Sequence, residues 1–241
     1  MQNKFRLRWI GQGGYELRVG DKTVYLDPYL SDMVEHSPEG LKRLTPPPIL
    51  PQNAKPDYFL ATHDHMDHLD TDLIRAMDCT GVRFFCPESC KAALLDLGQG
   101  IAQAQITVLC AGETVDLGAF SLEAVYADHT PDSIGFVLAV EGFRLYVTGD
   151  TLYNARVGAG VAADVICCCV NGKLGNMDAA EAVQVALRSG AKLAIPNHYG
   201  MFAENTADPQ EFVRLANAAG LKSCVAELGA WLDAAALIGK A

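Results

Sequence analysis

One segment decides the fold: Thr62-His63-Asp64-His65-Met66-Asp67-His68-Leu69-Asp70. Three of the six histidines of this 241-residue chain fall within it. It follows residues 57–62, whose composition predicts a buried strand. Imidazole nitrogens and carboxylate oxygens are ligands that zinc or manganese accepts. Side chains two apart in an extended loop point the same way, as His63 and His65 would, and Asp67 and His68 continue around the turn toward a second ion. The segment therefore predicts a metal site rather than a solvated polar turn.

Short strands with close turn signals occupy the chain before this segment. The alternation of apolar and polar residues predicts strands over 5–10, 15–19 and 23–26. The turn at Gly11-Gln12-Gly13-Gly14 lacks the Lys-Ser/Thr of a phosphate-binding loop, and we interpret it as a chain reversal. Residues 28–57 hold seven of the eleven prolines, which predicts a long irregular excursion and a candidate lid. His36, within it, is interpreted as a solvated surface residue.

Helices and strands alternate after the histidine segment. We expect helices from about residue 70, from Pro87 to Gly98, after Asp178 and after Asp208, the last two opened by capping boxes. The predicted strands cover residues 106–109, 120–127, 135–140, 143–148, 165–170 and 192–196, with a short final strand from Val225. Two strand-rich stretches, each followed by helices, predict an α/β fold with four layers, in which two mixed sheets pack face to face and helices lie outside. No composition shift marks a boundary, so residues 1–241 are predicted to form a single domain.

The charge and cysteine content narrow the class of function. Basic minus acidic residues give a net charge of −10, which argues against broad nucleic-acid binding. No apolar run reaches the ~18 residues of a membrane helix, and the first residues lack the apolar block of a signal peptide, so we expect a cytoplasmic protein with no membrane partner. Most of the eight cysteines, including Cys167-Cys168-Cys169, are interpreted as small buried core residues.

The motif His-x-His-x-Asp-His after a strand resembles the signature of the metallo-β-lactamase superfamily. This resemblance implies the αβ/βα sandwich and three further ligands in the order histidine, aspartate, histidine, each at a strand end. His129, Asp150 and His198 occupy such places. Carried over by position, the resemblance assigns His63, His65 and His129 to one metal ion. It assigns the second ion to Asp67, His68 and His198.

The same resemblance assigns two supporting carboxylates and a catalytic group. It places Asp150 as the bridge between two divalent ions, zinc or manganese, and Asp27 behind the site as an acceptor that orients a ligand histidine. Asp67 is the predicted catalytic residue, which holds the attacking water and later moves its proton. Substrate-binding residues are unknown at this point; Asn171, Lys173, Asn176 and Arg156 are candidates.

A narrower resemblance links the chain to the L-ascorbate-6-phosphate lactonase group. It is carried by Leu26-Asp27-Pro28-Tyr29-Leu30-Ser31, by Asn171-Gly172-Lys173 and by Pro196-Asn197-His198-Tyr199-Gly200. It implies a lactonase that acts on a phosphorylated sugar-acid lactone, and so a small-molecule partner, anionic or phosphorylated. The alternatives are a phosphodiesterase or RNA-processing nuclease of the same superfamily, and a metal-binding protein without turnover. A homo-oligomer is left open, and no nucleic-acid partner is expected.

Overall fold

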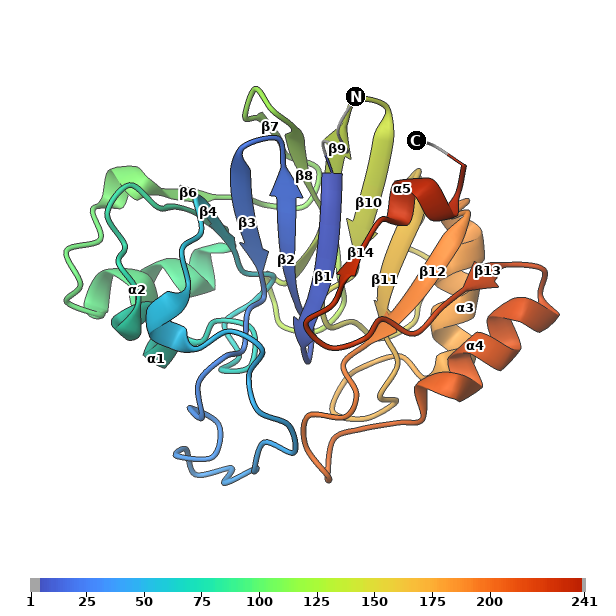
Figure 1. The fold of residues 1–241 in the computed structure, drawn as a ribbon, viewed down its shortest axis with the longest axis horizontal. Coiled ribbons are helices and arrows are strands. Elements are labelled where there is room, and N and C mark those ends of the chain that lie inside the picture. The colour runs from blue at the N-terminus through green and yellow to red at the C-terminus, as the bar shows by residue number, and fades with distance from the viewer. Residues whose placement is uncertain (1–4, 240–241) are drawn as a thin grey trace.

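The computed structural model describes residues 5–239, which form two seven-stranded sheets packed face to face (Figure 1). The first sheet has the order β14-β1-β2-β3-β4-β5-β6, with bounds β1 (Phe5–Gly11), β2 (Gly14–Val19), β3 (Lys22–Leu26), β4 (Tyr58–Leu60), β5 (Arg83–Cys86), β6 (Ile106–Val108) and β14 (Trp231–Leu232). The second has the order β13-β12-β11-β10-β9-β8-β7, with bounds β7 (Thr114–Asp116), β8 (Ser121–Tyr126), β9 (Ile134–Val140), β10 (Phe143–Val147), β11 (Val165–Cys169), β12 (Leu193–Asn197) and β13 (Lys222–Ser223).

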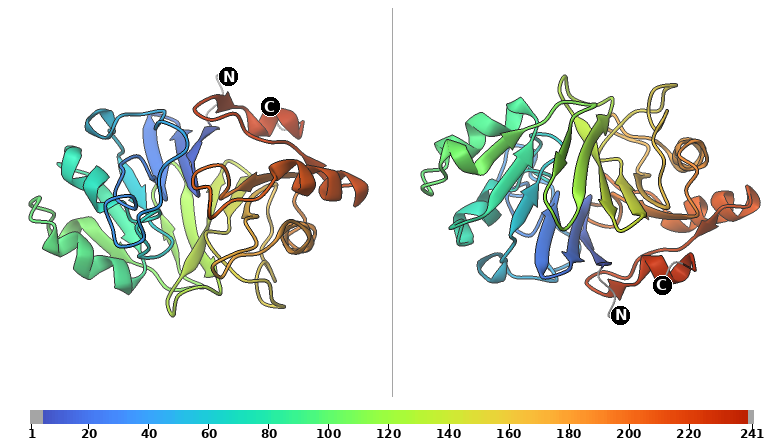
Figure 2. Two further views of the ribbon diagram at one scale, coloured as in Figure 1. Left: turned by 90° about the horizontal axis from the view of Figure 1, so that it is seen from below. Right: turned by 90° about the horizontal axis from the view of Figure 1, so that it is seen from above.

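Helices cover the outer faces of both sheets, as seen from below and above in Figure 2. The helices α1 and α2 lie on the first sheet, and α3 and α4 lie on the second. A short helix, α5, lies beside β1. Their bounds are α1 (Thr71–Ala76), α2 (Glu88–Asp96), α3 (Ala179–Arg188), α4 (Pro209–Ala218) and α5 (Ala234–Leu237), with single 3₁₀ turns at Pro51–Asn53 and Gln103–Gln105. The four-layer α/β sandwich predicted from the sequence is confirmed.

Both sheets are mixed, and this arrangement gathers strand ends at one edge. In the first sheet β1, β2 and β3 are antiparallel neighbours, whereas β3, β4, β5 and β6 run parallel. In the second, β8, β9 and β10 are antiparallel, and β10, β11 and β12 run parallel. Because the carboxyl ends of parallel strands share an edge, the loops after β4, β10 and β12 project from the same side of the sandwich.

The core between the sheets is built from alternating apolar strand residues. Leu7, Leu17 and Phe136 are among its fully buried members. A second apolar cluster lies between the first sheet and the helices α1 and α2. The triplet Cys167-Cys168-Cys169 in β11 is fully buried, and its strand places successive side chains on opposite faces, so these thiols fill core space as expected.

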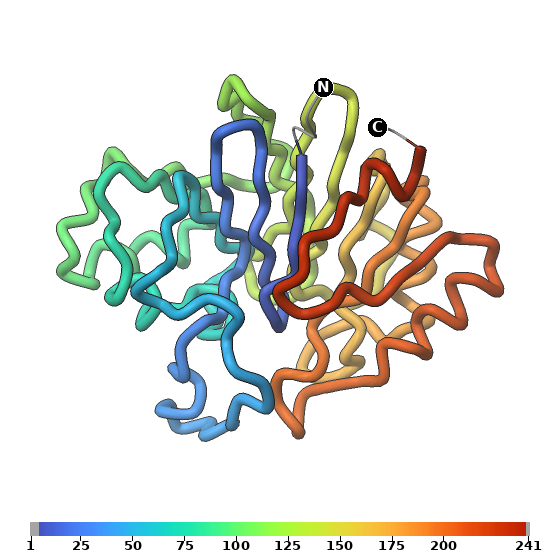
Figure 3. The backbone as a smooth tube through the Cα atoms, viewed as in Figure 1, coloured from blue at the N-terminus to red at the C-terminus, as the bar shows by residue number. Residues whose placement is uncertain are grey.

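The segment between β3 and β4 is the irregular excursion that its prolines predict. It projects with residues 198–207 beyond the ends of the sheets, and the two segments are joined where Leu44 donates its backbone N–H to the carbonyl of Met201 at 2.8 Å (Figure 3). Val34 of the excursion packs with Phe202 in a small apolar cluster. The excursion is thereby held over the edge where the strand ends gather.

Two local predictions differ from the structure. The final strand of the second sheet is β13 at Lys222–Ser223, not a strand from Val225, and the last strand of the chain, β14, crosses to the first sheet. Asp208 begins α4 by accepting the N–H of Gln210 at 2.9 Å, but Glu211 pairs with Arg214 instead of closing a capping box. The capping box before α3 is confirmed. No described helix has the length and apolar character needed to cross a membrane.

Candidate metal centre

The histidine segment forms a tight loop after β4 that ends in the first turn of α1. The N–H groups of His68 and Leu69 both donate to the carbonyl of His65, at 3.0 and 2.8 Å. Asp70 caps α1 by accepting the N–H of Leu73 at 2.8 Å, and it also accepts two backbone N–H groups and a hydroxyl from Leu30 and Ser31. This carboxylate therefore ties the loop to the start of the excursion and fixes the direction of the histidines.

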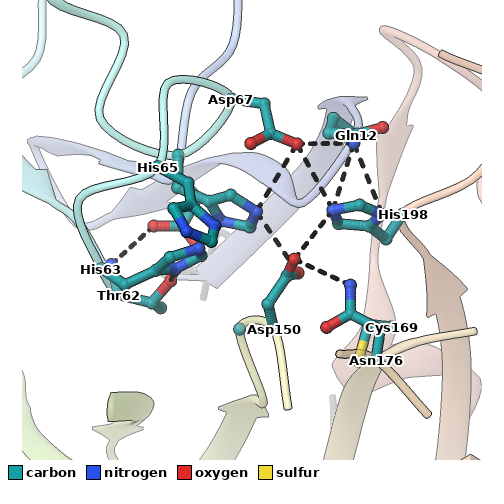
Figure 4. Close-up of polar contacts among 12 residues, drawn as sticks. Gln12, Thr62, His63, His65, Asp67, Asp150, Cys169, Asn176 and His198 are labelled. Carbon is teal, nitrogen blue, oxygen red and sulfur yellow. Dashed lines mark hydrogen bonds and ion pairs between the residues drawn. The ribbon is translucent and has the colours of Figure 1, made fainter. Parts of the chain in front are cut away.

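Each of the other predicted ligands follows a strand of the second sheet. His129 comes shortly after β8, Asp150 after β10 and His198 directly after β12. The structure brings all three against the histidine loop, so the seven predicted ligands converge although they span 136 positions of sequence, from His63 to His198. Figure 4 shows His63, His65, Asp67, Asp150 and His198 facing one another.

The ligand atoms form three overlapping groups, each within 4.8 Å. The groups are His63, His65 and His129; His63, His68 and Asp150; and Asp67, His68 and His198. The first and third groups match the two triads predicted from sequence.

Asp150 lies between the two triads. Its carboxylate oxygens approach His198 Nε2 at 3.1 Å and His68 Nε2 at 3.3 Å on one side. On the other side His129 Nε2 lies 3.8 Å away. A carboxylate has two oxygens that can serve two ions, so this position fits the predicted bridge.

Unpartnered buried atoms show that the cluster fits a cation. The Nε2 atoms of His63 and His68 and the Oδ1 atom of Asp150 are buried, and none makes a hydrogen bond among the described residues, although the last two lie 3.3 Å apart. His65 Nδ1 and His129 Nε2 lie only 3.1 Å apart, so two ring nitrogens of the first triad face each other. Buried polar atoms are normally satisfied, and here a divalent ion with nitrogen and oxygen ligands would satisfy them.

Asp27 supports the cluster from behind, as its predicted role requires. It is fully buried, and its Oδ2 lies 2.8 Å from His68 Nδ1. The backbone N–H and the hydroxyl of Thr62 also donate to it, at 2.7 and 2.6 Å. An acceptor at Nδ1 places the imidazole proton there, which leaves Nε2 of His68 free to bind a metal.

Gln12 is a site residue that sequence reasoning missed. Its Nε2 donates to Asp67 Oδ2 at 2.7 Å and lies 3.1 Å from His198 Nε2 (Figure 4). The backbone carbonyl of Gln12 accepts the indole N–H of Trp9 and the backbone N–H of His198. The turn at Gly11–Gly14 is thus more than a chain reversal, since it carries an amide that joins two predicted ligands. Its position directly after β1, at the edge where the other ligands gather, is the signal that could have found it.

Two further contacts orient the ligands of the second sheet. Asn176 Nδ2 donates to Asp150 Oδ2 at 2.7 Å, so this amide, a candidate for substrate binding, instead lies behind the bridging position. His129 Nδ1 lies 3.1 Å from the carbonyl of Gly175. Gly175 has a φ of 85°, and a Cβ there would lie 2.9 Å from His129 Nδ1, so glycine is required for this approach.

The buried carboxylates set the protonation of the cluster. Burial lowers the pKa of His198, but the Asp150 and Asp67 carboxylates beside it raise that pKa to about 9. Burial likewise opposes the charged form of His68, yet Asp150, Asp27 and Asp67 raise the pKa of its imidazole well above the usual value. The site thus favours bound positive charge at neutral pH, which either protons or cations supply.

Two imidazoles of the first triad, His63 and His129, have lowered instead of raised pKa values. Burial lowers the pKa of His63 well below its usual value, and the neighbouring His68 adds to this effect. Burial also lowers the pKa of His129. Both rings are therefore neutral at pH 7, the form in which imidazole nitrogen binds a metal.

Backbone strain concentrates at the site. Five described residues other than glycine have a positive φ, and four of them lie at or beside the cluster: Gln12 at 51°, Asp27 at 44°, Leu174 at 51° and His198 at 59°. Such residues occupy the left-handed region at an energetic cost of about 1–3 kcal/mol each, and strain of this kind clusters where function requires a particular side-chain direction.

A pocket of about 340 Å³ opens onto the cluster. Its floor includes His65, Asp67, His129 and Asp150. Its walls come from four loops: the excursion, the histidine loop after β4, the segment after β11 and the segment after β12. The wall residues are Val34, Glu39, Leu41, Asp64, Met66, Leu174, Phe202 and Asn205. The excursion therefore contributes to the site.

The remaining candidates for substrate contact are already engaged by other groups of the protein. Lys173 is exposed and its Nζ donates to the carbonyl of Glu204 at 3.1 Å. Asn171 donates to Asn205 Oδ1 at 2.7 Å. The guanidinium of Arg156 lies over the ring of Tyr126, 3.7 Å from its centroid. His36 is exposed on the excursion, in agreement with its interpretation as a surface residue.

Comparison with known families gives a match over most of the chain. The family model described as the beta-lactamase superfamily domain matches residues 22–199. A protein of Pyrobaculum islandicum named UPF0173 metal-dependent hydrolase is 28% identical over 222 residues, which cover 86% of this chain and 89% of that protein.

Solved structures share the fold at lower identity. Igni18, described as a metallo hydrolase from Ignicoccus hospitalis, superposes with a TM-score of 0.77 at 20% identity and covers 95% of this chain and 97% of its own. An isothiocyanate hydrolase from Delia radicum gut bacteria superposes with a TM-score of 0.75 at 16% identity, covering 94% and 98%. These likenesses establish a shared fold.

Proposed function

The chain belongs to the beta-lactamase superfamily, and on this basis we propose that it is a metal-dependent hydrolase. The observation that carries the proposal is the convergence of seven histidine and aspartate side chains at the floor of an open pocket. Three of their buried atoms make no hydrogen bond among the described residues. Two divalent ions bound there would lower the pKa of a shared water toward ~7 and polarise the group that it attacks. The names of the relatives support the same class of activity.

We assign the ligands as the geometry groups them. His63, His65 and His129 would hold one ion, and Asp67, His68 and His198 the other, with Asp150 between them. The donor set of imidazoles and carboxylates suits zinc, manganese or iron.

Asp67 is the proposed catalytic residue. One of its oxygens accepts from Gln12, and the other has no partner among the described residues, while the side chain lines the pocket. It would orient the attacking water, accept its proton as the bond to the electrophilic carbon forms, and return a proton to the leaving oxygen as the second bond breaks. Since no serine or cysteine lines the pocket, no covalent intermediate is invoked.

The finer prediction is a lactonase. Opening a lactone needs the machinery described above, namely an activated water, a polarised carbonyl and a group that moves a proton. A phosphorylated sugar-acid substrate such as L-ascorbate 6-phosphate is less well supported, because no lysine or arginine that could bind its phosphate lines the pocket. The same lining disfavours a nuclease, which needs cations along the phosphate backbone.

The test is turnover by protein stripped of metal and reconstituted separately with zinc, manganese and iron. The substrates would include neutral lactones, carboxylic esters, L-ascorbate 6-phosphate, a phosphodiester and, because a hydrolase of isothiocyanates has the same fold, an isothiocyanate. The proposal predicts hydrolysis of at least one substrate, abolished by a chelator and restored by metal. Metal binding without hydrolysis of any substrate would favour a binding protein.

A further inference from the structure

We propose that the pocket selects small, uncharged substrates that carry one apolar group, and that it discriminates against anionic ones. This inference deepens the proposed function and rests on it for the position of the reacting bond. The pocket has one apolar wall, formed by Val34, Leu41, Met66, Leu174 and Phe202. The metal ligands occupy its floor, so a molecule whose electrophilic carbon sits over the ligands would place its substituent against this wall.

Four of the five side chains of the apolar wall are held in place by packing against one another or their neighbours. Val34 and Phe202 are 2% and 1% exposed and belong to one packed cluster with Tyr29 and Met201. Leu41 and Met66 pack against the same cluster. The wall therefore has a defined shape in the structure, as expected of a binding surface that exists before a ligand arrives.

Leu174 supplies the rim of the wall. It is 72% exposed, the largest fraction among the exposed large hydrophobic residues of positions 5–239, and its φ of 51° is unusual for leucine. Asn176 donates its N–H to the Lys173 carbonyl at 3.1 Å, and Gly172 donates to the Met177 carbonyl at 2.9 Å, which holds the loop around Leu174. When an apolar ligand covers an apolar side chain that is exposed to water at the mouth of a pocket, the free energy of the system falls.

The charges around the pocket oppose an anion. The walls carry the carboxylates of Glu39 and Asp64, which are not among the proposed metal ligands, and the lining contains no lysine or arginine. Three cations on the adjoining loops have partners outside the pocket. Lys173 donates to a backbone carbonyl, and Arg43 donates to the carbonyls of Tyr29 and Ser31. Lys42 pairs with Glu35 at 3.6 Å. A phosphate or carboxylate on the substrate would lose water without gaining a charged partner in the walls.

One neutral polar group faces the substrate space. Asn205 lines the pocket and is 5% exposed, and its Oδ1 accepts from Asn171 Nδ2 at 2.7 Å, which fixes the orientation of the amide. Its Nδ2 donates to no acceptor among the described residues. An amide N–H in this position can donate to a neutral carbonyl or ether oxygen, which fits an uncharged substrate.

A matched pair of esters tests the inference. p-Nitrophenyl hexanoate and the mono-p-nitrophenyl ester of adipic acid have six-carbon acyl chains and differ in a terminal carboxylate. We expect the metal-loaded protein to hydrolyse the hexanoate with a kcat/KM at least about tenfold higher. Equal values, or a preference for the adipate ester, would overturn the inference.

Variants at Leu174 identify the wall as the cause. Leu174→Ser should lower kcat/KM for the hexanoate about tenfold and leave the acetate ester, which is too short to reach the rim, nearly unchanged. Leu174→Arg should reduce the difference in kcat/KM between the hexanoate and the adipate ester. The control is Leu187→Ser on α3, since Leu187 is 42% exposed and lies outside the pocket lining. If Leu187→Ser has the same effect as Leu174→Ser, the assignment of the wall is wrong.

A binding measurement separates this inference from the proposed function. Hexanamide and adipamic acid are the corresponding amides, and their binding to the zinc-loaded protein can be measured by saturation-transfer NMR. Tighter binding of hexanamide, weakened by Leu174→Ser, supports the inference even if no ester is hydrolysed, in which case the proposed function alone fails. Tighter binding of adipamic acid, or no binding of either amide, contradicts the inference even if some ester is hydrolysed.

Discussion

At the scale of single residues, the site depends on side chains that hold the ligands as much as on the ligands themselves. Asp27 fixes the tautomer of His68, Gln12 joins Asp67 to His198, and Asn176 holds Asp150. Such supporting contacts set the direction of each ligand atom, and their loss typically costs roughly 10–100-fold in metal affinity or activity in known metal sites.

Gln12→Ala removes the amide that contacts two of the proposed ligands. We expect zinc affinity to fall about 10–100-fold, because Asp67 and His198 lose the group that holds them in place. Competition with a chromophoric chelator measures this affinity. Gln210→Ala, an exposed glutamine on α4, is the matched control and should bind zinc as the unaltered chain does. Unchanged affinity in Gln12→Ala would remove the supporting role.

Asp67→Asn tests the catalytic assignment while preserving shape. The amide cannot accept a proton from the attacking water, so we expect kcat to fall about 10²–10⁴-fold. Circular dichroism and the metal content of the variant show whether the fold and the ions are retained. A variant that keeps its metal and most of its kcat would show that another group moves the proton.

The ligands of the first sheet could be predicted from sequence because they stand together. Three histidines within six residues directly after a strand rarely arise by chance, and Asp27 and the three ligands of the second sheet could then be assigned by resemblance. Gln12 and Leu174 could not be found this way. One polar residue among glycines has the same pattern as any tight turn, and an exposed leucine on a loop looks ordinary until the fold places it at the mouth of a pocket.

At the scale of elements, the excursion between β3 and β4 closes one side of the pocket. Its conformation depends on Arg43, whose guanidinium lies 4.4 Å from the ring centroid of Tyr29 and donates to the carbonyls of Tyr29 and Ser31. Hydrogen bonds from a charged donor contribute about 1.5–3 kcal/mol. The segment has no sheet pairing of its own, so these contacts set how readily it opens.

Arg43→Ala should therefore loosen the excursion. We expect limited proteolysis within residues 31–50 to accelerate about tenfold or more, because local opening becomes less costly by at least ~1.4 kcal/mol. Mass spectrometry of the fragments locates the cuts. Lys42→Ala, which removes an exposed neighbour, is the control. Equal cutting of both variants would show that Arg43 does not hold the segment.

Apart from the short strands β5 and β7, the order of elements up to α4 was predictable because hydrophobic alternation and helix caps are local signals. The strands at the end of the chain could not be predicted. The strands β13 and β14 contain two residues each, Lys222–Ser223 and Trp231–Leu232, too few for any period to appear. Trp231 is held by tertiary contacts, since the guanidinium groups of Arg6 and Arg8 both lie 4.7 Å from its ring centroid. Partners that distant in sequence leave no local pattern.

At the scale of the whole molecule, the proposed metal ions join the two sheets. The first sheet and its loops supply His63, His65, Asp67 and His68, whereas the second supplies the other three ligands. Ions bound across this junction stabilise the folded chain in proportion to their affinity. Loading with zinc should raise the melting temperature by several degrees, and a chelator should reverse the rise; a melting temperature indifferent to metal would contradict a junction site.

Metal binding should also release protons. In the metal-free chain His198, with a pKa of about 9, and His68, with a raised pKa, carry protons at pH 7, and a metal must displace them. Calorimetry in buffers of different ionisation enthalpy should show release of about two protons per chain at pH 7. The release should shrink as pH rises through about 9, and metal affinity should fall as pH drops. Heats that do not depend on the buffer would contradict these charge states.

The most direct test of a two-ion centre is anomalous diffraction from crystals of the metal-loaded protein. We predict two anomalous peaks ~3.5–4 Å apart, one bound by His63, His65 and His129, the other by Asp67, His68 and His198, with Asp150 touching both. A single peak, or peaks away from these side chains in protein that hydrolyses its substrate, would contradict this central claim.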